Sequence, residues 1–251
     1  MAEKRERVSD CMKYERLDLS LMKMYPQYSR TFISREIVNG NVMVNGKVAR
    51  RPGQKVFDAD IVSAVLTKQY VSFAGYKLAL AINHFGIDVA GKMCLDAGLS
   101  TGGFSDCLLQ HGAQKIYGID VGAAQIDSDL AKNNKLIVME KTDIRTVFEL
   151  PDKIQVCSLD FSFISLRLVI PIIEKLLDWH AQMIILVKPQ FEVGKEFICS
   201  GGIVRCDDAK KNAILAISDL CKSYGFNVSE AILAPKKEEN INDEYLLYCT
   251  R

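Results

Sequence analysis

The sequence predicts an α/β protein with a mainly parallel sheet, preceded by a smaller α+β domain. From residue 93 onwards, apolar segments of strand length alternate with segments of helical periodicity, which is typical of a parallel sheet covered by helices. A glycine-rich loop joins the first of these strands to a helix. The segment before residue 67 has its own short apolar pattern, which predicts a domain at residues 1–66 with its core at residues 14–66.

The chain is long enough for two unequal domains and has no segment typical of a membrane protein. It contains 251 residues, of which 49% are hydrophobic. No run approaches the roughly 18 consecutive apolar residues of a membrane span, and the N-terminal residues hold no apolar stretch that could form a signal peptide. We therefore expect a cytoplasmic protein.

The net charge of +1 hides an uneven distribution. Residues 1–68 carry 13 Lys and Arg against 8 Asp and Glu, whereas the rest of the chain carries 19 against 23. A basic N-terminal domain fits an anionic partner such as RNA, although a solvated charged surface explains the charge equally well.

Cysteine and histidine do not indicate a metal centre. The eight cysteines are scattered without a CxxC pair, and the three histidines lie far apart. Single cysteines in a cytoplasmic chain are typical of buried apolar positions. We expect no metal site.

The N-terminal domain should contain a helix followed by a hairpin. Ser29 can cap the helix and Asn39-Gly40 can end it. Asn45-Gly46, between two apolar stretches, predicts a tight hairpin turn. The apolar face of the helix would hold Phe32, Ile33, Ile37 and Val38.

The larger domain should alternate strands and helices and end in an antiparallel strand pair. The expected strands lie at residues 93–98, 115–120, 155–162, 183–189, 227–235 and 244–250, and the helices at residues 103–111, 166–180 and 207–225. Ligands of such sheets bind at the carboxyl ends of the parallel strands.

The loop "DAGLSTGGF" is the first candidate for a ligand site. Gly98, Gly102 and Gly103 let the backbone approach a ligand closely. Their spacing, GxxxGG, fits the GxGxxG template of nicotinamide dinucleotide enzymes poorly.

Three acids at successive strand ends favour a nucleoside ligand. Asp120 can accept hydrogen bonds from a ribose diol, Asp96 can orient the loop or meet a ligand ammonium group, and Asp143 can meet an adenine amino group. Both NAD and S-adenosylmethionine sites share the ribose-binding acid, so the acids alone leave both cofactors open.

Charged residues at two further strand ends are candidates for chemistry. Asp160 ends one predicted strand, and Lys188 follows four apolar residues on its neighbour. A structural ion pair is the alternative. Glu244 opens the last strand, and Lys77 lies at the start of the helix before the sheet.

Long motifs identify the larger domain as similar to a known family. The segments "AGYKLALAINHFGIDVAGKMCLDAGLSTGGFSDCLLQHGAQKIYGIDVG", "LDFSFISL", "LVKPQFEVGK" and "NDEYLLY" closely resemble the TlyA family, whose body is an FtsJ-like ribosomal RNA 2′-O-methyltransferase domain. The stretch "YSRTFISREIVNGNVMVNGKVARRPGQKV" resembles the alpha-L RNA-binding module of ribosomal protein S-four. We therefore expect a Rossmann-like class I methyltransferase domain at residues 73–251, joined by a linker at residues 67–72.

The resemblance implies methyl transfer from S-adenosylmethionine to a cytidine ribose hydroxyl of small- or large-subunit ribosomal RNA, by a monomer that binds ribosomal subunits and no membrane. It implies a catalytic tetrad of Lys77, Asp160, Lys188 and Glu244. The implied cofactor contacts are Asp96, Gly98, Ser100, Thr101, Gly102, Gly103, Phe104, Asp120, Val121, Asp143, Ile144 and Asp160. The candidate RNA contacts are Arg30, Arg35, Lys47, Arg50 and Arg51.

Lys188 is the candidate general base, which requires it to lose its proton near neutral pH. Burial and the nearby Lys77 favour this loss, whereas Asp160 and Glu244 oppose it, so we expect the carboxylates to orient the lysines. The alternatives are an RNA-binding protein without catalysis, a hemolysin, and an NAD-dependent oxidoreductase. For a hemolysin, the chain has no convincing amphipathic or spanning segment.

Three segments depart from the family pattern. "SFAG" at residues 72–75 stands where the family usually has "SRGG", which removes one cation near the RNA. "DAGLSTGGF" replaces the common "DVGASTGGF", and "KKEENIND" at residues 236–243 replaces a glycine-rich loop. These changes concern the substrate site more than the cofactor site.

Overall fold

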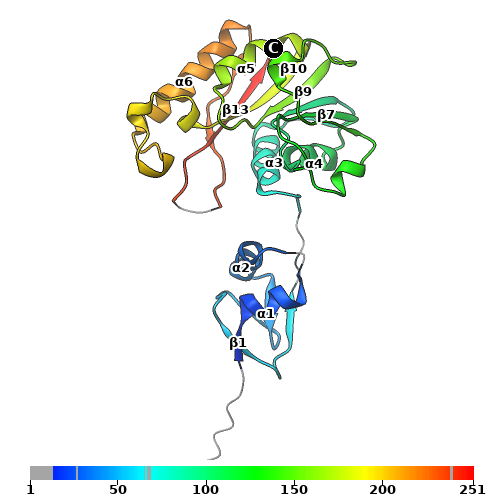
Figure 1. Cartoon of the computed structure of the whole chain (residues 1–251), viewed down its shortest axis with the longest axis vertical. Coiled ribbons are helices and arrows are strands. Elements are labelled where there is room, and N and C mark those ends of the chain that lie inside the picture. The colour runs from blue at the N-terminus through cyan, green and yellow to red at the C-terminus, as the bar shows by residue number, and fades with distance from the viewer. Residues whose placement is uncertain (1–13, 27, 65, 67–68, 238–239) are drawn as a thin grey trace, which may run out of the picture. The chain divides into compact units, whose positions relative to one another are not determined.

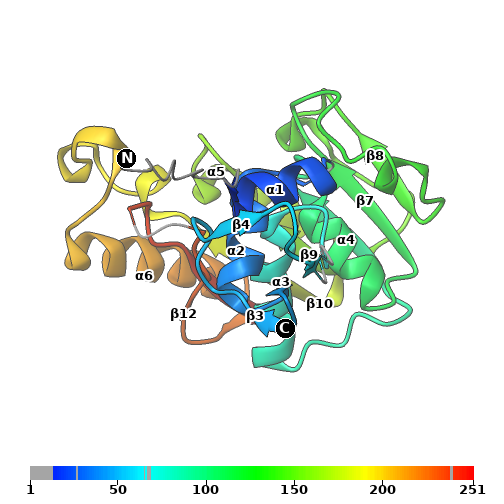
Figure 2. The ribbon, with the colours of Figure 1, turned by 90° about the horizontal axis from the view of Figure 1, so that it is seen from below.

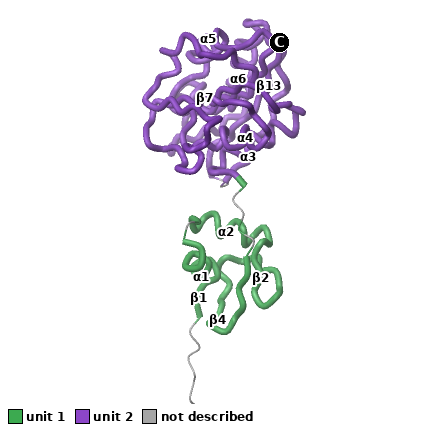
Figure 3. The backbone as a smooth tube through the Cα atoms, turned by 90° about the vertical axis from the view of Figure 1, so that its right-hand side faces the viewer, with its two compact units in different colours: residues 1–69 green, residues 70–251 purple. Residues whose placement is uncertain are grey.

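The protein divides into two compact units, residues 1–69 and residues 70–251 (Figure 3). The structure, a computed structural model, describes residues 14–26, 28–64, 66, 69–237 and 240–251. Of the expected linker, Thr67 and Lys68 lie outside the described residues, whereas Tyr70 is buried in the core of unit 2 and Val71 packs against it. Among the described helices, none combines the length and the apolar character that crossing a bilayer requires.

Unit 1 packs two helices against short antiparallel strands. Its elements are β1 (Tyr14–Arg16), α1 (Leu17–Met24), α2 (Arg30–Asn39), β2 (Val42–Val44), β3 (Lys47–Val48), β4 (Lys55–Phe57) and β5 (Val62–Ala64). Strand β1 pairs with β4, and β2 lies between β3 and β5. The helices bury Leu17, Leu21, Ile33 and Ile37 against these strands.

Helix α2 and the following hairpin begin and end where the sequence predicted. The Ser29 hydroxyl accepts a hydrogen bond from the Phe32 amide at 3.3 Å, and Gly40 ends the helix with a φ of 87°. Asn45 and Gly46, both with positive φ, connect β2 to β3.

The predicted buried face of α2 was wrong at one position. Val38 is 52% exposed, and Glu36 lies on the buried face instead. Asn41 donates a hydrogen bond to the Glu36 carboxylate at 2.6 Å, which satisfies this buried acid.

Unit 2 is built on a mixed sheet in the order β11-β13-β10-β9-β6-β7-β8, with β12 paired to β13. The strands are β6 (Met93–Ala97), β7 (Lys115–Ile119), β8 (Leu136–Met139), β9 (Ile154–Leu159), β10 (Leu177–Val187), β11 (Asn227–Val228), β12 (Ile232–Leu233) and β13 (Tyr245–Thr250). Strands β6 to β10 are parallel, and β13 runs antiparallel to β10, so the predicted sheet is confirmed. Figure 2 shows β7 and β8 at the edge away from β12.

Helices cover both faces of this sheet (Figure 1). Helices α3 (Phe73–Phe85) and α4 (Gly103–Gln110) bury their apolar sides on one face, where Leu78, Phe104 and Leu108 share a core. Helices α5 (Leu166–Leu176) and α6 (Asp207–Ser223) form the second core with the other face, through residues such as Ile170 and Ile217.

The helix predicted at residues 166–180 ends earlier than expected. It stops at Leu176, and residues 177–180 open strand β10, where Leu177 pairs with Ile154 of β9. This pairing spans more than 20 positions of the chain, so local periodicity could not reveal it.

The topology brings the predicted site residues to one rim of the sheet. Gly98, Asp120, Asp160 and Lys188 directly follow the parallel strands β6, β7, β9 and β10. Glu244 directly precedes β13, and because β13 is antiparallel, its beginning lies at the same rim.

A buried carboxylate is expected to hold unit 1 together. Asp18 is 1% exposed and accepts hydrogen bonds from Arg16 and Arg30, each at 2.9 Å. We expect Asp18→Asn to destabilise unit 1 by about 1–3 kcal/mol, because charge-assisted hydrogen bonds are lost. Hydrogen-exchange mass spectrometry of the full chain would show faster exchange in α1 and α2 while unit 2 is unchanged. The exposed Asp58→Asn is the control, and equal exchange in both variants would contradict this role.

Candidate active site

The glycine loop between β6 and α4 lies directly against the end of β9. Gly98 and Gly102 have φ values of 94° and 88°, which side-chain-bearing residues rarely adopt. A Cβ atom on Gly98 would lie 2.3 Å from the carbonyl oxygen of Asp160. The backbone can therefore make this turn only without a side chain at position 98.

Asp96 fixes the start of α4 from a completely buried position. One carboxylate oxygen, Oδ2, accepts hydrogen bonds from the Ser105 amide at 2.8 Å and the Ser105 hydroxyl at 2.6 Å. The other oxygen, Oδ1, has no hydrogen-bond partner. Burial, helped by the charge of Asp160, raises the pKa of Asp96 to about 7, although the hydrogen bonds from Ser105 lower it.

Asp120 holds the glycine loop through backbone hydrogen bonds. Its two carboxylate oxygens accept from the Ser100 amide at 2.8 Å and the Gly122 amide at 2.7 Å. A carboxylate has further acceptor positions, so Asp120 can still bind a ligand hydroxyl.

The Asp143 carboxylate forms an ion pair with the neighbouring Arg145. The same carboxylate caps the short turn at residues 144–146 and accepts from the Arg145 side chain at 3.0 Å. Hydrogen bonds from Arg145 lower the pKa of Asp143.

The remaining predicted cofactor contacts differ in how far their side chains are exposed to a ligand. Phe104 and Ile144 are 2% and 3% exposed and pack in the two cores, so they can offer a ligand only backbone groups. Val121 is 69% exposed, and Ser100 and Thr101 lie exposed on the loop. Gly103 is packed so tightly that a Cβ atom there would lie 2.1 Å from the Ser72 hydroxyl oxygen.

Asp160 and Lys188 form an ion pair at the rim beside the glycine loop. The Lys188 ammonium nitrogen lies 2.6 Å from Asp160 Oδ1 and donates a hydrogen bond to the Ser162 hydroxyl at 2.9 Å. The Asp160 amide donates to the Ala97 carbonyl at 3.0 Å, which ties this pair to the end of β6. Lys188 is 9% exposed. Sequence reasoning missed Ser162, whose contact depends on tertiary packing.

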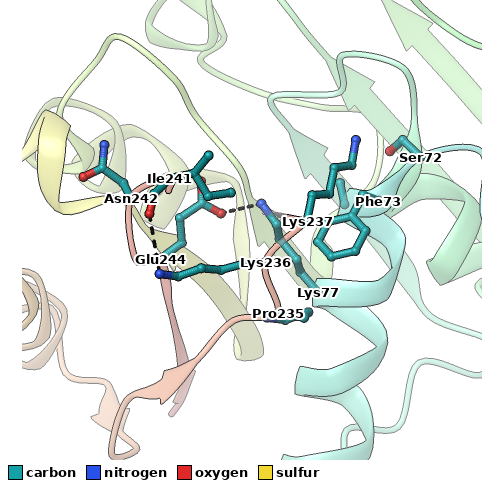
Figure 4. A pocket seen from close by; sticks show the side chains of 10 residues that line it. Ser72, Phe73, Lys77, Pro235, Lys236, Lys237, Ile241, Asn242 and Glu244 are labelled. Atoms are coloured by element: carbon teal, nitrogen blue, oxygen red, sulfur yellow. Dashed lines mark hydrogen bonds and ion pairs between the residues drawn. The ribbon is translucent and has the colours of Figure 1, made fainter. Parts of the chain in front are cut away.

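Lys77 and Glu244 form a second ion pair at the same rim (Figure 4). Their side chains are 15% and 20% exposed. Val187 pairs with Tyr245 across β10 and β13, so Lys188 and Glu244 occupy the next positions on adjacent strands. The structure thus brings all four tetrad candidates to the carboxyl rim, as two ion pairs.

A network that the sequence did not reveal holds the segment before Glu244. Asp243 forms ion pairs with Lys210 of α6, at 2.8 Å, and with Lys236. Asn242 accepts a hydrogen bond from the Val204 amide and donates one to the Gly202 carbonyl, each at 2.8 Å. Apart from the local Lys236–Asp243 pair, these contacts join chain positions more than 30 residues apart, so no local motif could have indicated them.

The candidate RNA-binding cations of unit 1 have different local partners. Arg30 pairs with Asp18, Arg35 pairs with Glu36 at 3.3 Å, and Arg50 donates to the Val38 carbonyl at 3.1 Å. Lys47 and Arg51 lie exposed near the hairpin. Arg16, which also pairs with Asp18, is a surface cation that the sequence reasoning did not select.

The rim of unit 2 fits a cofactor with a nucleoside and an ammonium group. Asp120 retains acceptor capacity, and Asp96 Oδ1 is an unsatisfied buried acceptor. Across the described part of the chain, no three His, Cys, Asp or Glu side chains are arranged to hold a metal ion.

Comparisons with known proteins give matches for both units. Residues 70–251 match the FtsJ-like methyltransferase family, and residues 15–62 match the S4 domain. Hemolysin A of Brachyspira hyodysenteriae is 39% identical over 88% of this chain and 93% of its own. The 16S/23S rRNA (cytidine-2′-O)-methyltransferase TlyA of Mycobacterium tuberculosis is 33% identical over 93% and 88%. A structure from Streptococcus thermophilus named as a hemolysin has a TM-score of 0.70 and 32% identity, covering 96% and 89%.

The buried Asp96 should make stability depend on pH. Its folded-state pKa of about 7 exceeds the value of about 3.9 in an unfolded chain, so the folded protein retains a proton that the unfolded protein releases. The resulting stabilisation is complete below about pH 4 and is lost as the pH rises to about 7, by up to about 4 kcal/mol.

Urea unfolding of the wild type and of Asp96→Asn between pH 4.5 and 7.5 would measure this contribution. We expect the free energy of unfolding of the wild type to fall relative to that of the variant as the pH rises. Parallel pH profiles for the two proteins would contradict a titrating Asp96.

Proposed function

The chain belongs to the FtsJ-like methyltransferase family, among the TlyA and hemolysin A proteins, and we propose that it methylates a ribose 2′-hydroxyl of ribosomal RNA. The observation that carries this proposal is the Lys188–Asp160 ion pair beside the glycine turn. The S4 match in unit 1 supports an RNA substrate. Because relatives are named as cytidine-2′-O-methyltransferases, cytidine is the proposed target.

S-adenosylmethionine is the proposed cofactor, and it would supply a methyl group activated by a positively charged sulfur. The residues proposed to hold it are the glycine loop, Asp96 and Asp120. Asp120 would accept hydrogen bonds from the ribose hydroxyls while it keeps the loop in place. Asp96 Oδ1 could accept from an ammonium group, which would favour its charged form.

Lys188 is the proposed general base for the substrate hydroxyl. A ribose hydroxyl is a weak nucleophile, so its proton has to be removed as its oxygen bonds to the methyl carbon. In its neutral form, Lys188 Nζ can take this proton. The ion pair with Asp160 and the hydrogen bond to Ser162 fix the position of the Lys188 side chain.

Lys77 and Glu244 are proposed to position the substrate ribose and to balance charge. Their ion pair places one positive and one negative charge at the rim. Lys77 is therefore present as a cation while the net charge of the site is unchanged. Glu244 occupies the position next to Lys188 on the adjacent strand, so the pair lies beside the proposed base.

Replacement of Lys188 tests the proposed chemistry directly. We expect Lys188→Ala to reduce methyl transfer at least about 100-fold, as loss of a general base does. The assay would use tritiated S-adenosylmethionine with isolated ribosomal subunits, followed by nucleoside chromatography to identify 2′-O-methylcytidine. The exposed Lys195→Ala is the matched control. Cofactor affinity should stay unchanged in both, and full activity of Lys188→Ala would exclude it as the base.

Replacement of Asp120 tests the proposed cofactor site. Because Asp120 would bind the ribose and orders the loop, we expect Asp120→Ala to weaken cofactor binding by about 1.5–3 kcal/mol. Titration calorimetry with S-adenosylhomocysteine would measure this loss. Asp129→Ala, at a side chain that is 88% exposed, is the control. An unchanged affinity for Asp120→Ala would mean that the ribose is held elsewhere.

A further inference from the structure

A pocket of about 270 Å³ opens next to the Lys77–Glu244 ion pair (Figure 4). It lies between the start of α3 and residues 235–237, 241, 242 and 244. Pockets for whole ligands usually have about 300–1,000 Å³, so this one suits part of a nucleotide. Both members of the ion pair line it, which places it next to the proposed catalytic group.

The lining combines an aromatic ring with positive charge. Phe73 is partly exposed, and the Lys237 ammonium nitrogen lies 5.6 Å from the centre of its ring. Lys77 and Lys236 also line the pocket, and Glu244 is its only carboxylate among the described lining residues. The first residues of α3 belong to the wall, and the N-terminal end of a helix favours anions.

The three lysines are not equivalent. Lys77 is paired with Glu244, and Lys236 is paired with Asp243 and contacts the Ile241 carbonyl. Lys237 is exposed and, among the described residues, has no carboxylate within ion-pair distance. Among the described residues, Lys237 is therefore the pocket lysine without an acidic partner.

We propose that this pocket binds the nucleotide adjacent to the methylated one, with its base against Phe73 and its phosphate at Lys237. The inference rests on the proposed function, because the pocket shares the Lys77–Glu244 pair with that site. Proteins hold unpaired RNA by stacking bases on aromatic side chains and by pairing phosphates with cations. The pocket offers an aromatic ring and a cation close together, because the Lys237 ammonium nitrogen lies 5.6 Å from the centre of the Phe73 ring.

Steady-state methyl transfer to isolated ribosomal subunits tests this role. Phe73→Leu keeps an apolar side chain but removes the flat ring, and we expect it to raise KM for the RNA about 5- to 100-fold with kcat largely retained. Phe73→Tyr should behave like the wild type. Lys237→Gln should raise KM and reduce the salt dependence of RNA binding by about one charge, whereas Lys237→Arg should preserve both. Affinity for S-adenosylhomocysteine should stay unchanged in every variant, which also confirms folding.

Lys135→Gln is the matched charge control. Lys135 is exposed and precedes β8, at the opposite edge and opposite end of the sheet from the pocket. The double variant Phe73→Leu with Lys237→Gln should lose less than the product of the two single losses, since both side chains would hold the same nucleotide.

The outcomes separate this inference from the proposed function. If the wild type methylates RNA and both Phe73→Leu and Lys237→Gln keep its KM, the pocket proposal is overturned and the proposed function stands. If the wild type transfers no methyl group to ribosomal RNA, the proposed function fails. Binding of a fluorescent single-stranded oligoribonucleotide then tests the pocket proposal by itself. Equal affinity of the wild type and both variants would overturn the pocket proposal, and a lower affinity of both variants would support it.

Discussion

The close approach of Gly98 to Asp160 is the constraint on which the rest of the site depends. Strands β6 and β9 are parallel neighbours, and the Asp160 carbonyl occupies the space that a Cβ atom on Gly98 would need. The loop that can hold a cofactor and the strand end that carries a charged side chain are therefore in direct contact. Any side chain at position 98 would separate them, because the obstacle is backbone and cannot move as a flexible side chain does.

The direction of the last strand completes the rim. In a fully parallel sheet, a residue that opens a strand would lie at the amino edge, away from the ligand. Strand β13 is antiparallel to β10, so Glu244 opens β13 beside the end of β10, one position from Lys188. The rim consequently holds two partly buried ion pairs, Lys77–Glu244 and Lys188–Asp160. Pairing lowers the desolvation free energy that each buried charge costs.

Much of the fold could be predicted because its signals are local. Ser29, Gly40 and Asn45-Gly46 mark their turns by their own conformational preferences, and Asp160 and Lys188 stand out because they end apolar strands. Contacts set by distant segments could not be predicted in this way. The strand at residues 177–180 depends on pairing with β9, and the support of Asp243 depends on Lys210 of α6. The exposure of Val38 follows from the exact rotation of a helix that buries Glu36 instead.

The most direct test of the account is a crystal structure with S-adenosylhomocysteine bound. The account predicts that the sulfur atom lies at the carboxyl rim beside the Gly98 turn, facing the Lys188–Asp160 pair, with the ribose hydroxyls at Asp120. A ligand bound at another part of unit 2, or one whose sulfur points away from Lys188 with the ion pair outside reach, would contradict it.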